Sequence, residues 1–153
     1  MCIRDRVSQL TYLSWEQFEA FSVELIAAYV GGEAKLTAKG IDSGADGVVF
    51  SLAGNILIQS KHTKSDRTIT ADASAEVYKA KPLYENATGK SFERLIAITN
   101  AEKYSSKVRR AAELRGVELM AIKDIKKILK KHSVDIETVT ARLDKERLEL
   151  VSR

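Results

Sequence analysis

Apolar residues recur at spacings of three and four between Phe18 and Tyr29, and this periodicity predicts an amphipathic helix. Ser14 and Gln17 have the spacing of a capping box, in which each side chain accepts a hydrogen bond from the backbone N–H of the other residue. Gly31–Gly32 follow the last apolar positions, where glycine commonly ends a helix. We therefore expect a helix from Ser14 to about Tyr29.

Short apolar runs bounded by turn residues predict strands in the rest of the chain. Ala53 and Gly54 separate two of these runs and indicate a hairpin, which makes that pair of strands antiparallel. Within the strand expected at residues 92–99, the four positions from Leu95 to Ile98 are all apolar, as is typical of a strand buried on both faces. The strands are expected at residues 33–38, 47–52, 55–62, 92–99 and 117–122.

Helices are expected to alternate with the later strands, which predicts an α/β fold with parallel strands beside the antiparallel hairpin. One helix begins at Asp72 or Ser74 and contains Pro82, which predicts a kink or a restart because proline removes a backbone donor. Another begins at Ser105 or Ser106 and ends before the glycine at 116. Its inward-facing residues are predicted to be Val108, Ala111, Ala112 and Leu114.

The end of the chain is richer in charge. Residues 124–131 predict a short basic helix whose buried positions are Ile125, Ile128 and Leu129. Residues 135–151 predict a charged helix with one apolar face formed by Ile136, Val139, Leu143 and Leu150. Packing on the core, pairing with a partner and leading into a further domain are all compatible with this pattern.

The 153 residues include 25 Lys and Arg against 21 Asp and Glu, a net charge of +4. This balance permits binding to a polyanion but does not require it. No stretch approaches the roughly 18 uninterrupted apolar residues of a membrane span. No secretory signal follows the N-terminus, so we expect a cytoplasmic protein that does not bind membranes.

The first six residues, MCIRDR, resemble the translation of a sequencing adapter. We therefore expect residues 1–6 to be an artefact, and we leave them out of the prediction of the fold. The single cysteine of the sequence, Cys2, lies within them, so cysteine usage carries no information about the redox compartment.

Polar side chains gather at the open end of the predicted hairpin. Asp46 precedes its first strand, and Gln59 and Lys61 lie near the end of its second. Antiparallel strands joined by a tight turn place those ends side by side. Glu19 shares the core-facing side of the first helix, where a carboxylate is costly unless it is paired or binds a ligand. It is also close enough to the helix start to stay hydrated and favour the helix dipole.

These residue types fit the metal-dependent hydrolysis of a phosphodiester. Mg²⁺ takes oxygen ligands and retains several waters. Asp46 offers a carboxylate, Gln59 an amide oxygen and Ser60 a backbone carbonyl, whereas Glu19 would bind a second metal or orient a water. Lys61 would hold or activate the attacking water and offset charge on the phosphate. An Asp followed by Gln-x-Lys is common by chance, so the spacing alone is a weak signal.

A longer series of motifs adds weight to this pattern. In chain order these are Phe18-Glu19 in the first helix, the turn Asp42-Ser-Gly44-Ala-Asp46-Gly47, the strand Ile56-Leu-Ile-Gln59-Ser-Lys61, a strand ending Ile98-Thr99-Asn100, and a helix followed by Gly116-Val117-Glu118-Leu119. The series is similar to that of the catalytic domain of Mrr-like restriction endonucleases, a branch of the PD-(D/E)xK nuclease superfamily. The resemblance covers about residues 12–131, which we take as the nuclease domain, with 132–153 as a C-terminal charged helix or linker.

This resemblance implies a restriction-endonuclease-like three-layer core in which helices flank a mixed central sheet. It implies catalytic roles for Asp46, Gln59, Lys61 and Glu19. The metal ligands would come from Asp46, Gln59, Glu19 and the Ser60 backbone carbonyl, and the metal would be Mg²⁺, with Mn²⁺ as the alternative. Asp42 matches the first acid of the family's turn, and it either serves the site or only caps the turn. Most members of the superfamily have an acidic residue at the position of Gln59. The loss of that negative charge is expected to weaken metal affinity.

Double-stranded DNA is the expected substrate. Basic residues beside the site are expected to contact phosphates without reading the base sequence: His62, Lys64, Arg67 and Lys107. Each of them singly is also compatible with an ordinary solvated side chain. A homodimer, or an additional recognition or ATPase domain, is a further expectation from the resemblance.

The leading hypothesis is a Mg²⁺-dependent DNA endonuclease that acts in restriction, as a defence against foreign DNA. The first alternative is a nuclease like the Holliday-junction resolvases. A second is a catalytically inactive nuclease-fold module that binds DNA or another protein, and the presence of Asp46, Gln59 and Lys61 argues against it. The plainest alternative is an α/β domain in which these three residues are incidental.

Overall fold

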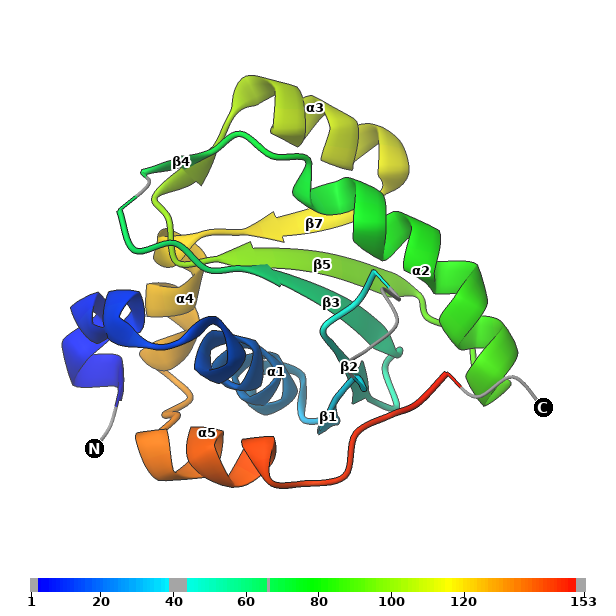
Figure 1. Ribbon diagram of the computed structural model, residues 1–153, viewed down its shortest axis with the longest axis horizontal. Coiled ribbons are helices and arrows are strands. Elements are labelled where there is room, and N and C mark those ends of the chain that lie inside the picture. The colour runs from blue at the N-terminus through cyan, green and yellow to red at the C-terminus, as the bar shows by residue number, and fades with distance from the viewer. Residues whose placement is uncertain (1–2, 39–43, 66, 151–153) are drawn as a thin grey trace.

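A five-stranded mixed sheet forms the centre of the computed structural model, which describes residues 3–38, 44–65 and 67–150 (Figure 1). The strand order is β1-β2-β3-β5-β7. The first two pairings are antiparallel and the last two are parallel, so the predicted mixed sheet is confirmed. The strands are β1 (Glu33–Leu36), β2 (Gly47–Phe50), β3 (Ile56–Lys61), β5 (Arg94–Thr99) and β7 (Val117–Met120).

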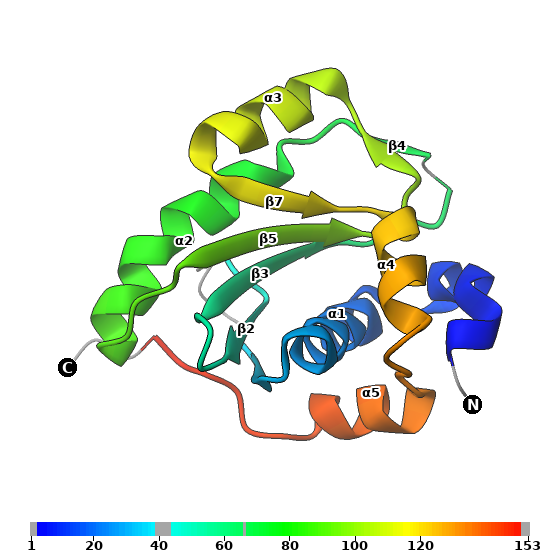
Figure 2. The same ribbon diagram turned by 180° about the vertical axis from the view of Figure 1, so that it is seen from behind.

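Helices cover both faces of this sheet and complete three layers (Figures 1 and 2). One face is packed by α1 (Trp15–Val30) and α4 (Ile122–Leu129), with α5 (Ile136–Leu143) lying against α1. The other face is packed by α2 (Ala73–Thr88) and α3 (Ser106–Arg115). A 3₁₀ segment, η1 (Ile3–Tyr12), precedes α1 and lies beside α4. No helix in the described part of the chain is long and apolar enough to cross a membrane.

The interior strands are buried on both faces because a layer of helices packs on each side of the sheet. Ile58 and Ile96 belong to the cluster under α1, whereas Leu57 and Leu95 belong to the cluster under α2. Successive strand residues point to opposite faces, so this alternation assigns a side to every residue of β3. Residues 57, 59 and 61 face the α2 layer, and residues 56, 58 and 60 face the α1 layer.

The start of α1 follows the predicted capping box. Ser14 Oγ accepts a hydrogen bond from the Gln17 N–H at 3.1 Å, and Gln17 Oε1 accepts one from the Ser14 N–H at 2.8 Å. Gly31 ends the helix with a φ of 74°, a left-handed conformation that glycine adopts without steric cost. The predicted boundaries of this helix are confirmed to within a residue.

Two details of the helices differ from expectation. α2 continues through Pro82 as one helix, so the predicted restart is wrong. Pro82 and the neighbouring Tyr78 are exposed, and water can reach the carbonyl that the missing donor leaves free. Leu114, predicted to be buried in α3, is 84% exposed, because only the narrow stripe of Val108 and Ala112 reaches the sheet.

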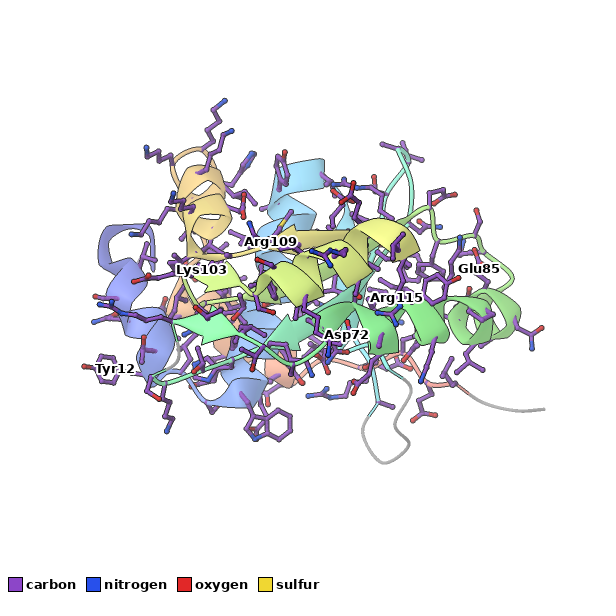
Figure 3. The ribbon with its side chains drawn as sticks, turned by 90° about the horizontal axis from the view of Figure 1, so that it is seen from above. Tyr12, Asp72, Glu85, Lys103, Arg109 and Arg115 are labelled. Atoms are coloured by element: carbon purple, nitrogen blue, oxygen red, sulfur yellow. The ribbon has the colours of Figure 1, made fainter. Side chains whose placement is uncertain are left out.

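An ion pair joins the start of α2 to the end of α3 (Figure 3). Asp72 caps α2 by accepting from the Ser74 N–H at 3.1 Å, and Arg115 Nη1 donates to its other oxygen at 2.5 Å. Burial acts to raise the pKa of Asp72, but hydrogen bonds from Arg115 and Ser74 outweigh it and hold that pKa below its ordinary value. The pair therefore fixes how the two helices of this layer sit against each other.

The C-terminal region packs on the core. Residues 135–151 do not form a single helix, because α5 ends at Leu143 and the chain then continues in an extended form. Val139 is fully buried against α1, and Arg142 forms an ion pair with Glu24 of that helix. Leu148 makes a parallel bridge to Thr37, next to the edge strand β1. The segment after α5 thus covers the edge of the sheet at β1, which the apolar periodicity did not predict.

Candidate active site

Asp46 lies where the ladder between β2 and β3 begins. Gly47 is paired with Ile58, and the Asp46 N–H also donates to the Ile58 carbonyl at 2.8 Å. Two residues of one strand thus oppose one residue of the other, which is the arrangement of a β-bulge. A Cβ at Gly47 would lie 2.1 Å from Val23 Cγ1 of α1, so only glycine fits here. Bulges re-aim neighbouring side chains, and this one turns Asp46 toward β3.

The Asp46 carboxylate is hydrogen-bonded to Ser60 of β3. Asp46 Oδ2 accepts hydrogen bonds from the Ser60 N–H at 2.8 Å and from Ser60 Oγ at 3.1 Å. Ser60 separates Gln59 from Lys61, so the carboxylate reaches the strand at the middle of the Gln-x-Lys motif. Asp42, the other acid of the predicted turn, lies outside the described residues.

Gln59 and Lys61 project from the face of β3 opposite to Ser60, toward the α2 layer. Gln59 pairs with Ala97 and Lys61 with Thr99 in the parallel ladder to β5. The Gln59 side chain is largely buried, at 6% exposure, whereas Lys61 is half-buried at the strand end. Both therefore lie at the carboxyl ends of the parallel strands, where open α/β sheets commonly bind ligands.

Polar side chains from β5 hold the end of β3. Thr99 Oγ1 donates to the Lys61 carbonyl at 2.7 Å. The Asn100 amide accepts from the Thr63 N–H at 2.9 Å and donates to the Thr63 carbonyl at 2.7 Å. These bonds continue the pairing beyond Lys61 and keep its backbone rigid, which is how a reactive side chain is held in one geometry.

Glu19 lies on α1, on the Ser60 side of β3. It is 5% exposed, as expected for a carboxylate on the core-facing side of the helix. The ring of Phe18, the preceding residue, lies 5.3 Å from the ring of His62, one residue beyond Lys61. Glu19 is thus near the same end of β3 but across the strand from Gln59 and Lys61. Its role as a metal ligand stays a prediction.

His62 has partners inside the protein. Its Nε2 lies 2.8 Å from the Leu10 carbonyl oxygen, and its ring packs on Phe18. These contacts fasten η1 to the end of β3. A phosphate contact by this side chain stays a prediction, and the observed geometry gives the ring a packing role.

Exposed basic residues form a rim around the same end of the sheet. Beyond β3, the short strand β4 (Thr68–Ile69) pairs in parallel with β6 (Lys103–Tyr104). Arg67 forms an ion pair with Glu102 at 3.8 Å, and both side chains remain mostly exposed. This pairing places Arg67 beside the segment that leads into α3, where Lys107 occupies the first turn. Lys64 follows Thr63, which is hydrogen-bonded to Asn100 after β5. Figure 3 labels two further basic residues of this region, Lys103 in β6 and Arg109 in α3.

The end of β3 offers oxygen atoms of the kind that a divalent cation binds. No group of three or more His, Cys, Asp and Glu side chains placed to hold a metal occurs among the described residues. Within the described residues, the Gln59 side-chain amide and Asp46 Oδ1 have no hydrogen-bond partner, and no fully buried polar side-chain atom lacks one. These two oxygens are therefore open to water, and they are available to a ligand.

The sequence matches the Mrr_cat restriction endonuclease family over residues 10–129. The chain belongs to this family. The resemblance seen in the motifs is therefore confirmed, and with it a nuclease of the restriction class that hydrolyses DNA. Enzymes of this family generally use a divalent metal. No curated protein matches the sequence.

Two solved structures have the same fold as this Mrr_cat domain. The protein of unknown function AF1548 superposes with a TM-score of 0.62 at 16% identity, over 85% of this chain and 79% of that one. The DNA modification-dependent restriction endonuclease AspBHI superposes with a TM-score of 0.54 at 15% identity, over 90% of this chain. The Mrr_cat chain spans only 38% of the length of AspBHI. The restriction-endonuclease fold expected from the motifs is confirmed.

Several residues that shape the Mrr_cat site could not be found from the sequence. Thr37 donates to the Ala45 carbonyl at 2.6 Å, and the Ser60 hydroxyl binds Asp46. Neither threonine nor serine stands out in a pattern of apolar periodicity, and each bond joins segments that are separate in the sequence. Thr99 and Asn100 appeared in the motif series, but their hydrogen bonds depend on the register of β3 against β5.

Proposed function

We propose that the protein is a Mg²⁺-dependent DNA endonuclease of a restriction system, directed against foreign DNA. The observation that carries this proposal is the pair of oxygens at the end of β3, on Gln59 and Asp46, to which no described residue donates a hydrogen bond, beside a lysine whose carbonyl is bound by Thr99 of β5. Asp46, Gln59 and the Ser60 carbonyl would hold the metal, with Glu19 approaching from the α1 side. Mn²⁺ would substitute in the same oxygen-rich site.

The proposed reaction adds water to phosphorus and breaks one of the two ester P–O bonds. The bound cation would supply Lewis-acid stabilisation of the phosphate. The Lys61 ammonium would hold the attacking water and offset the negative charge that grows on the phosphate oxygens. Thr99 would keep Lys61 in position through its backbone, and Ser60 would orient the Asp46 carboxylate.

Plasmid cleavage tests this function. The protein should convert supercoiled DNA to nicked or linear forms with Mg²⁺ or Mn²⁺ and should be inactive in EDTA. Asp46→Asn should bind Mn²⁺ far more weakly in calorimetry, because it keeps an oxygen for Ser60 but removes the charge. Cleavage that persists in EDTA, or wild-type affinity for Mn²⁺ in Asp46→Asn, would refute the metal-dependent mechanism.

The DNA substrate decides between restriction and the alternatives. Because AspBHI is a DNA modification-dependent enzyme, methylated and unmethylated plasmids are both needed. Selective cleavage of a four-way junction would favour a resolvase. DNA binding without cleavage of any of these substrates, in the presence of metal, would indicate the inactive binding module.

The basic rim provides a separate prediction about the path of DNA. We propose that Lys64, Arg67 and Lys107 contact phosphates, since they are exposed and lie next to the end of β3 and the paired strands β4 and β6. Each phosphate contact adds about 0.9 to the slope of log K against log salt concentration. Replacing all three residues with Gln should therefore lower the slope by about 3, measured by fluorescence anisotropy with duplex DNA in EDTA.

Lys90→Gln is the matched control for this measurement. Lys90 precedes β5, whose six residues place it roughly 17 Å from the Thr99 end of the strand. This variant loses one positive charge away from the rim, and its salt slope should equal that of the wild type. A triple variant with the wild-type slope would remove the rim from the proposed DNA path.

A further inference from the structure

Thr37 connects the Asp46 segment to the edge of the sheet. It follows β1 and is 2% exposed. Its N–H donates to the Asp46 carbonyl at 3.0 Å, and its Oγ1 donates to the Ala45 carbonyl at 2.6 Å. The backbone that precedes the bulge is therefore held on one side by Thr37 and on the other by Ile58 of β3.

The extended segment that follows α5 holds Thr37 in turn. The Leu148 N–H donates to the Leu36 carbonyl at 2.8 Å, and the Ala38 N–H donates to the Leu148 carbonyl at 2.8 Å. Arg147 Nη1 donates to the Thr37 carbonyl at 3.0 Å. Hydrogen bonds from one segment thus reach Thr37 and both of its neighbours.

The apolar side chains of this segment pack in the same place. Leu148 and Leu150 are partly buried against the cluster under α2, which includes Ala45. By contrast, Val139 of α5 belongs to the cluster under α1. The chain thus passes around the β1 edge of the sheet, from the α1 layer to the layer that Gln59 and Lys61 face.

We propose that residues 144–150 form a positioning strap for Asp46, acting through Thr37 on the bulge that aims the carboxylate. This inference rests on the proposed metal site. The strap lies beyond residues 10–129, the part of the chain that matches the Mrr_cat family. Thr37, Arg147 and Leu148 are positioning residues, since they reach the site only through the backbone at Ala45 and Asp46.

Two variants break the strap at different points. Thr37→Val keeps the shape of the side chain but removes the hydrogen bond to Ala45, and Thr37→Ser restores it. Leu148→Pro removes the N–H that donates to Leu36, whereas Glu149→Pro places the same ring one residue further on. Among the described residues the Glu149 N–H has no hydrogen-bond partner, so Glu149→Pro is the matched control.

Amide hydrogen exchange and Mn²⁺ calorimetry without DNA provide the readouts. Thr37→Val and Leu148→Pro should exchange the Asp46 N–H faster and bind Mn²⁺ about tenfold more weakly, the size of effect typical of residues that orient a ligand. At saturating Mn²⁺ their cleavage rate should return toward that of the wild type. Thr37→Ser and Glu149→Pro should match the wild type in both measurements.

Wild-type exchange at Asp46 and wild-type Mn²⁺ affinity in both disrupted variants would overturn the strap. Exchange that rises equally across the whole chain would also overturn it, since that would show general destabilisation. If the wild type and Asp46→Asn have the same Mn²⁺ affinity, the proposed metal site fails. The exchange data would still decide whether the strap holds the Asp46 backbone.

Discussion

Lys61→Ala should reduce the rate of DNA cleavage by about 10²–10³-fold, as does removal of one group that stabilises transition-state charge in other enzymes. The Lys61 ammonium would act on the phosphate only as its charge grows, so kcat should fall while the affinity for DNA changes little. The half-buried Lys61 side chain projects from the end of β3. It makes none of the hydrogen bonds that hold that strand, so the fold should persist. Single-turnover cleavage and anisotropy measure the two effects separately.

Lys90→Ala provides the control for the loss of one positive charge, because Lys90 lies beyond the opposite end of β5 from Lys61. Its cleavage rate should equal that of the wild type. Circular dichroism and melting temperature should show that both variants are folded. If Lys61→Ala cleaves DNA at the wild-type rate, the lysine has no part in the chemistry. If it loses only DNA affinity, Lys61 is a phosphate-binding residue like those of the rim.

Arg142→Ala should lower the free energy of unfolding by about 3 kcal/mol, because it leaves the Glu24 carboxylate buried without its partner. The side chains of Arg142 and Glu24 are only 14% and 15% exposed, and their ion pair joins α5 to α1. For a domain of this size, that loss corresponds to a melting temperature about 10 °C lower. Urea denaturation followed by circular dichroism measures it directly.

The matched control is the ion pair between Arg94 and Glu118, which is also formed by an arginine and a glutamate but is 35% and 44% exposed. Arg94→Ala should cost less than about 1 kcal/mol, since water screens exposed pairs. The double variant Glu24→Leu/Arg142→Met should recover much of the stability by replacing charges with apolar side chains. Equal losses in Arg142→Ala and Arg94→Ala would show that burial does not strengthen the α5 attachment.

Local patterns encoded most of the secondary structure. Ser14 and Gln17 specify the start of α1 because the capping box lies within four consecutive residues. The continuous apolar run of β5 predicted a strand buried on both faces, which the two helical layers confirm. Leu114 and the length of the last helix were misjudged, since the pattern identifies apolar positions but not how far the neighbouring surface extends.

The candidate site was only partly accessible from the sequence. The motif order placed Asp46, Gln59 and Lys61 at one end of a hairpin, and the antiparallel pairing of β2 with β3 agrees with that arrangement. The same reasoning treated His62 as a DNA contact, yet its ring packs on Phe18. A histidine beside a catalytic strand has the same sequence signature whether it faces solvent or an adjacent helix.

By itself, the sequence determined the family, the α/β class and the residue types offered to a metal, because motifs and apolar periodicity are local properties of the chain. Only the tertiary structure decided how those residues are held. The bulge that aims Asp46, the Thr99 bond behind Lys61 and the strap over Thr37 all join segments far apart in sequence. Backbone donors and acceptors are the same at every residue, so their pairing is set by strand register and edge contacts, which appear only when the chain is folded.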